Sequence, residues 1–388
     1  MNDELLVKGA TLLDPALGIY EKKDLAIFDG KIRDVSEQIS DANARRVIDA
    51  SGLIVTPGFV DIHAHVALDI LRLCIDPSEH CLMKGTTTVA DAGSCGELNF
   101  LPFHEFVIKR NKIRILAFLN IESLGMIEFV DSPVWNTDQK WAKLLNSPAS
   151  SKMFANPTNT KDLIQKNRQT IVGIKWAHHT LDLLQLARKT ADEVSCKVMA
   201  ESRLLPVSLK YLKNGDIATH IFHFARHRIA KKHDGITEDG KTIHSEVYAA
   251  KRREVVFDVG HGKGSFSWDV ARLALKEGLE PDTISTDLWS GNVDGPVYDL
   301  PTTMAKFLHL GMSLAKVVEA VTSKPASVLG RKGEFGTLKP GNQADLVAFK
   351  LQRRKKVLTD SYGKSEIGNE VIIPLHVIKG GDVVKTVG

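Results

Sequence analysis

The chain has few of the residues and segments that mark disulfide-rich, membrane or nucleic-acid-binding proteins. Its 388 residues include four cysteines, none in a Cys-x-x-Cys pair, which favours reduced thiols in a cytoplasmic protein. No apolar stretch approaches the ~20 residues that span a membrane. The first ten residues, MNDELLVKGA, lack the apolar core of a signal peptide. The formal net charge is only +4, and no basic run is interleaved with aromatic residues, so nucleic acid is not an expected partner.

What the chain does have is the composition of an ordinary globular protein. Hydrophobic residues make up 43% and charged residues 25% of it. The length allows one large domain and a smaller one, with ample core. A small molecule is the expected partner, and the sequence leaves a homo-oligomer open.

Two patterns divide the chain. Near both ends, short runs of alternating apolar and polar residues, such as LLVKGATLLD and EVIIPLHVIKGGDVVKTV, are typical of a small antiparallel sheet. Between them, apolar runs alternate with amphipathic helical stretches such as TLDLLQLARKTADEV, which indicates repeated βα units. The predicted fold is therefore α/β. It combines a TIM barrel over residues 56–338 with a small β-sandwich domain built from residues 1–55 together with 339–388.

Eight apolar runs are predicted to form the barrel strands. They end near His65, Ala92, Asn120, Lys175, Glu201, His220, Val259 and Asp287. In a TIM barrel all of these strand ends meet on one face, where active sites are found. Residues far apart in the sequence are therefore expected to meet there.

The most informative stretch is residues 57–66, PGFVDIHAHV, which contains two histidines separated by one residue. Residues two apart on a strand point to the same face, so His63 and His65 can direct both imidazoles at one point. Such a pair alone is weak evidence for a metal. Buried charges at strand ends are costly unless they are paired or metal-bound. A metal site is favoured because four further ionisable residues end predicted strands: Lys175, Glu201, His220 and Asp287.

Taken together, these residues and their surroundings resemble the amidohydrolase superfamily. The segments that carry the resemblance are PGFVDIHAHV, STD and the closing PASVLG…GTLKPGNQADLVAF, and it covers essentially the whole chain. More narrowly, GDIATH, VVFDVGHGKGSFSWDVA and PDTISTDLW are similar to a dihydroorotase-like group of amidohydrolases and deacetylases. That group includes enzymes that remove acyl groups from N-acyl amino acids or related esters.

The resemblance implies a centre of two divalent metal ions, with zinc expected, bridged by a carboxylated Lys175 and by hydroxide. His63, His65 and Asp287 would hold the more buried ion, and His220 would hold the second. The lysine needs its carboxyl group because an ammonium repels a cation, whereas a carbamate offers two oxygens. Asp287 would also be the catalytic residue, taking a proton as hydroxide attacks and passing it to the leaving group.

Glu201 departs from the family pattern. The family has a histidine at this strand end, where the chain reads VMAESR. A carboxylate can also ligate zinc, and a site richer in oxygen suits manganese or iron as well. Two hypotheses stay open: Glu201 is a ligand of the second metal, or it only forms hydrogen bonds and a single metal remains.

Residues that contact the substrate are harder to predict. His261 lies in GHGKGSF, a glycine-rich turn that either approaches a ligand closely or is simply tight. Arg203 is a candidate for holding a substrate carboxylate, as are Arg226, Arg228 and Lys263. Cys95 is expected to be a small buried residue, because a metal-bound hydroxide makes a thiol nucleophile unnecessary.

Three hypotheses for function follow. The first is a metal-dependent hydrolase that cleaves an amide or ester bond of a small acylated substrate. The second is a cyclic amidohydrolase, such as a dihydroorotase or hydantoinase, working with the same site. The third, suggested by Glu201, is a metal-poor, non-catalytic barrel that acts as a binding subunit.

Overall fold

Two β-sheets contain the named strands of the chain. The computed structural model describes residues 4–42, 44–126, 154–177, 181–201, 205–223, 235–237 and 239–384. The first sheet is parallel, and its order across the sheet is β12 (Val256–Phe257), β11 (Ile217–Ala218), β10 (Lys197–Ala200), β9 (Ile171–Trp176), β8 (Arg114–Asn120), β7 (Thr86–Ala92) and β6 (Phe59–Ala64). These seven strands end within two residues of their predicted ends.

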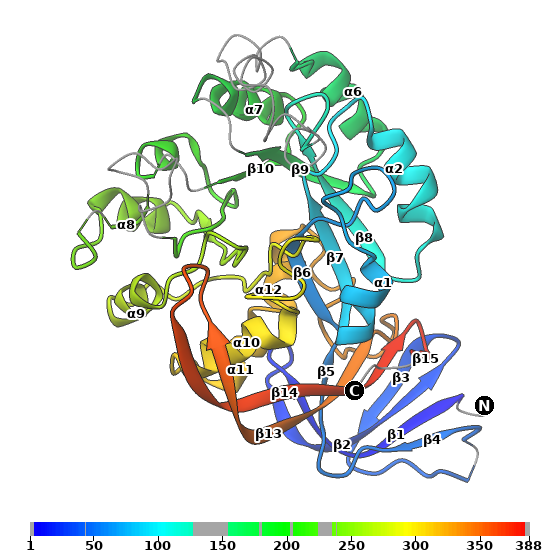
Figure 1. Ribbon diagram of the computed structural model, residues 1–388. Coiled ribbons are helices and arrows are strands. Elements are labelled where there is room, and N and C mark those ends of the chain that lie inside the picture. Colours follow the sequence, from blue (N-terminus) through cyan, green and yellow to red (C-terminus); the bar gives the residue numbers. More distant parts are fainter. Residues whose placement is uncertain are drawn as a thin grey trace.

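Helices lie around the outside of the parallel sheet (Figure 1). They are α1 (Pro77–His80), α2 (Phe100–Phe106), α6 (Pro157–Lys166), α7 (Leu181–Glu193), α8 (Ser245–Arg252), α9 (Trp268–Lys276), α10 (Leu300–His309), α11 (Leu314–Glu319) and α12 (Ser323–Val328), with the 3-10 turns η1 (Leu82–Lys84), η2 (Ile108–Arg110) and η5 (Val207–Tyr211). Because helices and core cover both faces of the sheet, strands such as β7 are buried at every position.

The sequence of α7 shows why these helices pack as they do. Its buried residues are Leu183, Leu184, Ala187, Thr190 and Ala191, the spacing of one helical face. At α10, the Asp299 side chain caps the helix by accepting from the backbone N–H of Thr302. No helix in the described part of the chain is both long and apolar enough to span a membrane.

Residues 283–288 lie between the two edges of the parallel sheet. Thr283 forms a parallel bridge with Asp258, next to β12, and Leu288 forms one with Ala64, the last residue of β6. The sequence predicts a strand here, whereas the structure has two isolated bridges and no named strand. The ladder is interrupted where Asp287 adopts a left-handed conformation with φ 50°. Its N–H still donates to the carbonyl of His63 at 2.6 Å, which brings Asp287 to the end of β6.

Strands from both ends of the chain share the second sheet. It contains β1 (Leu5–Asp14), β2 (Ile19–Phe28), β3 (Lys31–Ser36), β4 (Val47–Asp49), β5 (Ile54–Pro57), β13 (Leu346–Thr359), β14 (Ser365–Lys379) and β15 (Asp382–Val384). The two ends join where β5 pairs antiparallel with β13. The sheet packs on an apolar cluster of its own, and Figure 1 shows it below the parallel sheet.

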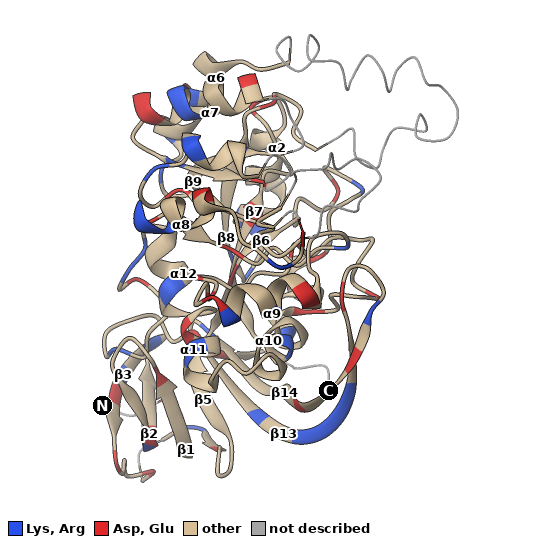
Figure 2. Cartoon of the chain, turned by 90° about the vertical axis from the view of Figure 1, so that its left-hand side faces the viewer, with Lys and Arg blue, Asp and Glu red and all other residues tan. Residues whose placement is uncertain are grey.

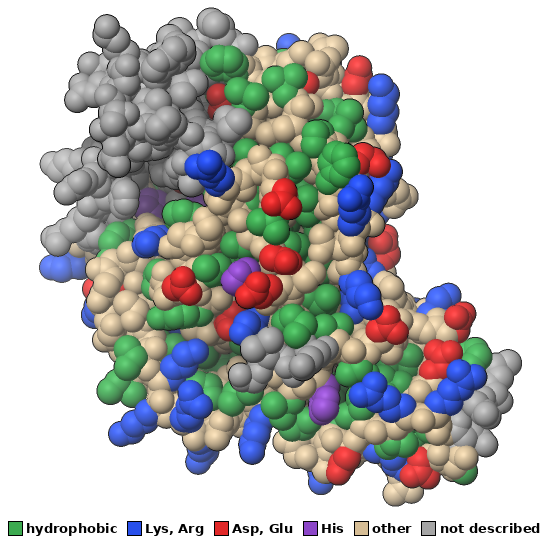
Figure 3. All heavy atoms as spheres, turned by 45° about the vertical axis from the view of Figure 1, so that its right-hand side comes forward, with side chains coloured by type: hydrophobic (Ala, Val, Ile, Leu, Met, Phe, Trp, Pro, Cys, Tyr) green, Lys and Arg blue, Asp and Glu red, His purple; other side chains and the backbone are tan. Residues whose placement is uncertain are grey.

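Charge is spread over the surface. Figure 3 shows acidic and basic side chains mixed on one face, with apolar groups between them. Basic residues are denser within β13, part of which is blue in Figure 2. They are Lys350, Arg353, Arg354, Lys355 and Lys356.

Asp345 links the two sheets through a buried ionic cluster. Its carboxylate is 2.7 Å from Nζ of Lys379, at the end of β14, and 3.0 Å from a guanidinium nitrogen of Arg114, the first residue of β8. Burial lowers the pKa of Lys379 to about 8, against the opposing effect of Asp345. This one carboxylate therefore bridges Lys379 of the second sheet and Arg114 of the parallel sheet.

Replacing Asp345 with asparagine should destabilise the protein by about 3 kcal/mol, because it leaves the buried ammonium of Lys379 without its counter-charge. Urea unfolding measures this free energy. Asp382→Asn is the matched control, since Asp382 pairs with Lys112 across 3.5 Å with both side chains exposed. If the two variants were equally stable, the cluster would not be the link between the sheets.

Candidate metal centre

His63 and His65 lie together at the carboxyl end of β6, as their spacing predicts. Both side chains are buried. Their Nε2 atoms are 3.4 and 3.2 Å from the same oxygen, Oδ1 of Asp287. Among the described residues, these three form a group whose ligand atoms all lie within 4.8 Å of one another. Two imidazoles and a carboxylate at these distances are a donor set suited to a divalent transition metal.

The orientation of His63 is fixed by a chain of hydrogen bonds. The Thr219 hydroxyl donates to Oδ2 of Asp258 at 2.7 Å, and Nδ1 of His63 is 2.8 Å from the same hydroxyl oxygen. Because the single hydroxyl proton goes to Asp258, the oxygen must accept from Nδ1–H of His63. Nε2 of His63 then carries the lone pair, and it faces Oδ1 of Asp287 and Nζ of Lys175.

His65 is held by a second chain of the same kind. The Ser94 hydroxyl donates to Oδ2 of Asp91 at 2.7 Å, and Nδ1 of His65 is 2.8 Å from it. Burial raises the pKa of Asp91, while hydrogen bonds from the Val66 and Ser94 N–H groups oppose this rise. Each histidine thus has a hydroxyl and a carboxylate behind it, an arrangement that fixes the tautomer of metal-binding histidines.

Lys175 and His220 surround the same point. Nζ of Lys175 lies 3.2 Å from Nε2 of His63, and its side chain is 1% exposed. His220 donates Nδ1–H to the carbonyl of Gly260 at 2.6 Å, and its Nε2 is 4.0 Å from Oδ2 of Asp287. The rings of His220 and His63 are 4.8 Å apart. These two residues come from β9 and from the segment after β11, so three separate strand ends meet here.

Glu201 follows the last residue of β10 and is buried. Its charge acts on Lys175. Burial lowers the pKa of Lys175, and the negative charge of Glu201 is the largest of the effects that oppose this, followed by that of Asp287. Glu201 therefore belongs electrostatically to the same cluster as the residues described above.

Gly93 and Gly262 allow backbone to lie against this cluster. A Cβ at Gly93 would fall 2.6 Å from the Cβ of Lys175, and one at Gly262 would overlap Oδ2 of Asp287. Both glycines have positive φ, which disfavours other residues further. Neither was predicted as a site residue, although GHG after a strand was a signal of close approach.

Of the two predicted substrate-binding residues, His261 lies in the described part of the chain. The His261 side chain is fully buried, with Nδ1–H donating to the Gly262 carbonyl and Nε2 2.6 Å from Nζ of Lys306. Burial, and then the charge of Lys306, lower its pKa well below the usual value. Because both ring nitrogens are engaged within the protein, any contact with substrate would come from the backbone of this turn. Arg203 lies outside the described residues, as do Arg226 and Arg228.

The hydroxyl and carboxylate residues behind the histidines were not predicted from the sequence. Thr219 directly precedes His220, and Asp91 and Ser94 come at the end of β7 and just after it. Their position near strand ends was the available signal. Serine and threonine are too common at such places for this signal to distinguish them.

Known proteins resemble the chain along nearly all of its length. A deacetylase from Agrobacterium fabrum is 32% identical over 367 residues, which are 92% of this chain and 85% of that protein. A deacetylase from Enterococcus faecalis is 31% identical over 376 residues, 93% of this chain and 94% of that protein. The crystal structure of a dihydroorotase has a TM-score of 0.83 at 30% identity and covers 98% of this chain and 99% of that one. The structure of an adenine deaminase has a TM-score of 0.84 at 29% identity, with coverage of 99% and 100%.

A family model also matches part of the chain. The model of the amidohydrolase family matches residues 218–384, a range that includes His220 and Asp287. The full-length relatives extend the similarity to the rest of the chain. The chain therefore belongs to the amidohydrolase family, enzymes that hydrolyse carbon–nitrogen bonds, as the resemblance of its sequence segments implied.

Proposed function

We propose that this chain is a metal-dependent deacylase that hydrolyses the amide or ester bond of a small acylated substrate. The observation that carries the proposal is the pair of histidines whose Nε2 lone pairs are directed by hydrogen bonds toward Asp287. Relatives named deacetylase, 31–32% identical along nearly the whole chain, indicate the substrate class.

The residues present fit two divalent ions, with zinc expected and manganese or iron as alternatives. His63, His65 and Asp287 would hold one ion, and His220 and Glu201 would hold the other. A bound ion lowers the pKa of water toward ~7 and polarises the scissile carbonyl. The buried and oriented donors support this assignment, since unpaired charges at such a site would be costly.

Lys175, in carboxylated form, would be the shared ligand. Carboxylation requires the neutral amine: its nitrogen attacks the carbon of carbon dioxide and then loses a proton, leaving a carbamate with one negative charge. Burial lowers the pKa of Lys175 and so favours the neutral amine. The carbamate would supply two oxygen donors, where the unmodified side chain has the single nitrogen that lies 3.2 Å from Nε2 of His63.

Asp287 would move the proton during the reaction. One of its oxygens faces the two histidines, and the other lies toward His220. A carboxylate with one oxygen engaged can accept a proton from the attacking water on the other and deliver it to the leaving amine or alcohol. His261 and Arg203 stay proposals for substrate binding, through the backbone of the turn in the first case and through charge in the second.

At the level of the fold, we propose that residues 283–288 act as the eighth strand and close a TIM barrel over residues 56–338. Their hydrogen bonds to both edges of the parallel sheet support this. Residues 1–55 and 339–388 would form the second domain, a β-sandwich in which the curved eight-stranded sheet folds over its own apolar cluster. The catalytic face would then lie at the carboxyl ends of the strands.

A cyclic amidohydrolase is the second candidate, because a dihydroorotase of known crystal structure is 30% identical to this chain in sequence. Metal-reconstituted protein should be assayed against N-acyl amino acids and acyl esters on one side and dihydroorotate and hydantoins on the other. Turnover of the cyclic substrates alone would refute the deacylase proposal. A metal-free, inactive protein would favour the third hypothesis, that of a binding subunit.

Replacing Lys175 with alanine should remove most of the bound metal and of the activity, because the shared ligand is lost. A small carboxylic acid should restore part of both by taking the place of the carbamate. Metal analysis and turnover measure this. Lys197→Ala is the matched control, since Lys197 is a partly buried lysine at the opposite end of the neighbouring strand β10. A Lys175→Ala variant with full metal content would exclude the shared ligand.

Replacing Asp287 with asparagine keeps the size of the side chain but removes the proton acceptor. General acid–base catalysis contributes typically 10²–10⁴-fold, so kcat should fall by at least roughly two orders of magnitude. KM should change less, because the loss affects the chemical step. Metal content should survive better than in a variant that lacks both His63 and His65. Near wild-type turnover with metal retained would contradict the proton-transfer role.

Replacing Thr219 with valine removes the hydroxyl that fixes the tautomer of His63 at nearly constant volume. Loss of such a partner typically weakens metal binding 10–100-fold, which competition with a chromogenic chelator measures. Thr219→Ser keeps the hydroxyl and should bind metal almost as tightly as the wild type. Equal affinity of the valine and serine variants would show that the hydrogen bond does not control metal binding.

A further inference from the structure

The β13–β14 hairpin is longer than its place in the sheet requires. β13 has 14 residues and β14 has 15, but β5 pairs only with Leu346–Phe349 of β13. Beyond that point the two strands pair with each other as far as the Thr359–Ser365 pair. At ~3.3 Å per residue, the ten residues from 350 to 359 extend about 33 Å. Figure 1 shows the hairpin, in orange and red, reaching past α10 toward α9.

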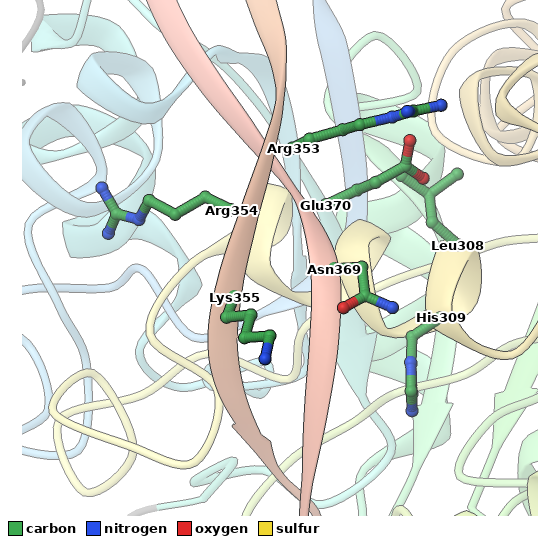
Figure 4. Close-up of a pocket in the computed structure, with 7 residues that line it drawn as sticks. All are labelled: Leu308, His309, Arg353, Arg354, Lys355, Asn369 and Glu370. Atoms are coloured by element: carbon green, nitrogen blue, oxygen red, sulfur yellow. The ribbon is translucent and has the colours of Figure 1, made fainter.

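The middle of this hairpin is only partly packed against α10, where Nε2 of His309 lies 2.8 Å from Glu366 and Nζ of Lys356 donates to the Thr302 hydroxyl at 3.0 Å. A hollow of about 560 Å³ lies between it and the end of α10, lined by Leu308 and His309 on the helix and by Arg353 and Glu370 on the strands (Figure 4). In Figure 4 the Arg354 side chain points in a different direction from Arg353, so the basic residues do not converge on a common ligand. Around this hollow the hairpin is held at its base, by contacts with α10 and at its tip.

The tip is fastened to the turn that contains Gly262. The Ser361 hydroxyl lies 2.9 Å from the carbonyl oxygen of Gly262 and 3.1 Å from that of His261, so its proton is shared between them. The backbone N–H of Ser361 donates to the carbonyl of Phe266 at 2.9 Å. The Tyr362 hydroxyl donates to the carbonyl of Gly264 at 2.9 Å. One short segment of the hairpin thus holds both sides of the turn.

Lys306 of α10 ties three segments together at the same place. Its Nζ donates to the carbonyls of Thr359 at 2.7 Å and Pro296 at 2.9 Å, and lies 2.6 Å from Nε2 of His261. The side chain is fully buried. An ammonium has three protons, and each has one acceptor here. Since His261 accepts on Nε2, its Nδ1–H is available for the Gly262 carbonyl, which is 2.9 Å away.

Gly262 joins this turn to the segment that carries Asp287. Its N–H donates to the carbonyl of Thr286 at 2.9 Å, and a side chain at this position would overlap Oδ2 of Asp287. The backbone of the turn thus packs directly against the Asp287 carboxylate. Any shift of Gly262 changes the space in which Asp287 can move. A misplacement of about 1 Å in a catalytic group can lower the rate 10²-fold.

We propose that Ser361 and Lys306 are positioning residues, which hold the turn at residues 260–262 against Asp287 and so set the place of its carboxylate. The sheet built from the two chain ends thereby controls the geometry of the reaction in the other sheet. The inference rests on the proposed function, in which Asp287 transfers the proton. It assigns to the long hairpin a role that its pairing within the sheet does not require.

The test is Ser361→Ala, compared with Ser365→Ala. Ser365 lies four residues along on the same hairpin, and its hydroxyl contacts that of Thr359 at an exposed position. We expect kcat for an acylated substrate to fall about tenfold in Ser361→Ala with KM within about twofold, and to stay unchanged in Ser365→Ala. Ser361→Thr keeps a hydroxyl and should recover most of the lost kcat, which a purely structural contact would not predict.

Visible absorption of the cobalt(II)-loaded proteins gives a second measurement that needs no substrate. Because Asp287 is a proposed ligand, the ligand-field bands should shift in Ser361→Ala and not in Ser365→Ala. Wild-type-like kcat and bands in Ser361→Ala would overturn the positioning role and leave the hydrolase proposal intact. A wild-type protein that neither takes up cobalt or zinc nor hydrolyses acylated substrates would overturn the proposed function, and the positioning role with it.

Discussion

Three buried aspartates, Asp61, Asp91 and Asp258, are the groups on which the arrangement of the site depends. Each lies at least 98% out of contact with solvent, and desolvation raises the pKa of all three, that of Asp61 to about 7. The cost of burying them is offset because each accepts a hydrogen bond from another segment of the chain. Asp61 accepts a hydrogen bond from the Thr286 hydroxyl, and Asp258 accepts one from the Thr219 hydroxyl. Both hydrogen bonds join separate segments of the chain. Satisfying these carboxylates therefore fixes where the strand ends lie.

The same bonds determine what the strand ends can do chemically. A histidine near a metal is useful only if the correct nitrogen carries the lone pair, and a freely rotating hydroxyl would leave that choice open. Asp258 and Asp91 remove the choice, since each takes the single proton of the neighbouring Thr219 or Ser94 hydroxyl. Stability and reactivity are therefore not separate demands here. The hydroxyls of Thr219 and Ser94 offset the desolvation of the buried carboxylates, and the same hydroxyls orient His63 and His65.

Two sequence patterns predicted which ionisable residues meet at the strand ends. Alternation on a strand predicted that His63 and His65 share a face, and apolar runs ending in ionisable residues predicted that Lys175 and His220 join them. The hydroxyl partners were not predictable, because their contacts join segments 29 and 156 residues apart and nothing local marks them. The predicted strand before Asp287 is only two bridges in the structure. Its threonine and serine side chains turn to Asp61 and Asp258, a tertiary demand that overrides local β-propensity.

Glu201 has a consequence for the charge of the proposed centre. With Asp287 and a carbamate on Lys175, it gives the donor set one more negative charge than a histidine would supply at this position. Two divalent ions and a hydroxide would then leave the centre closer to neutral, which reduces the cost of holding it among buried groups. A more neutral centre also attracts an anionic substrate less strongly. Recognition of a carboxylate on the acyl acceptor would therefore depend more on basic residues around the site, the role in which Arg203 was predicted, than on the metals themselves.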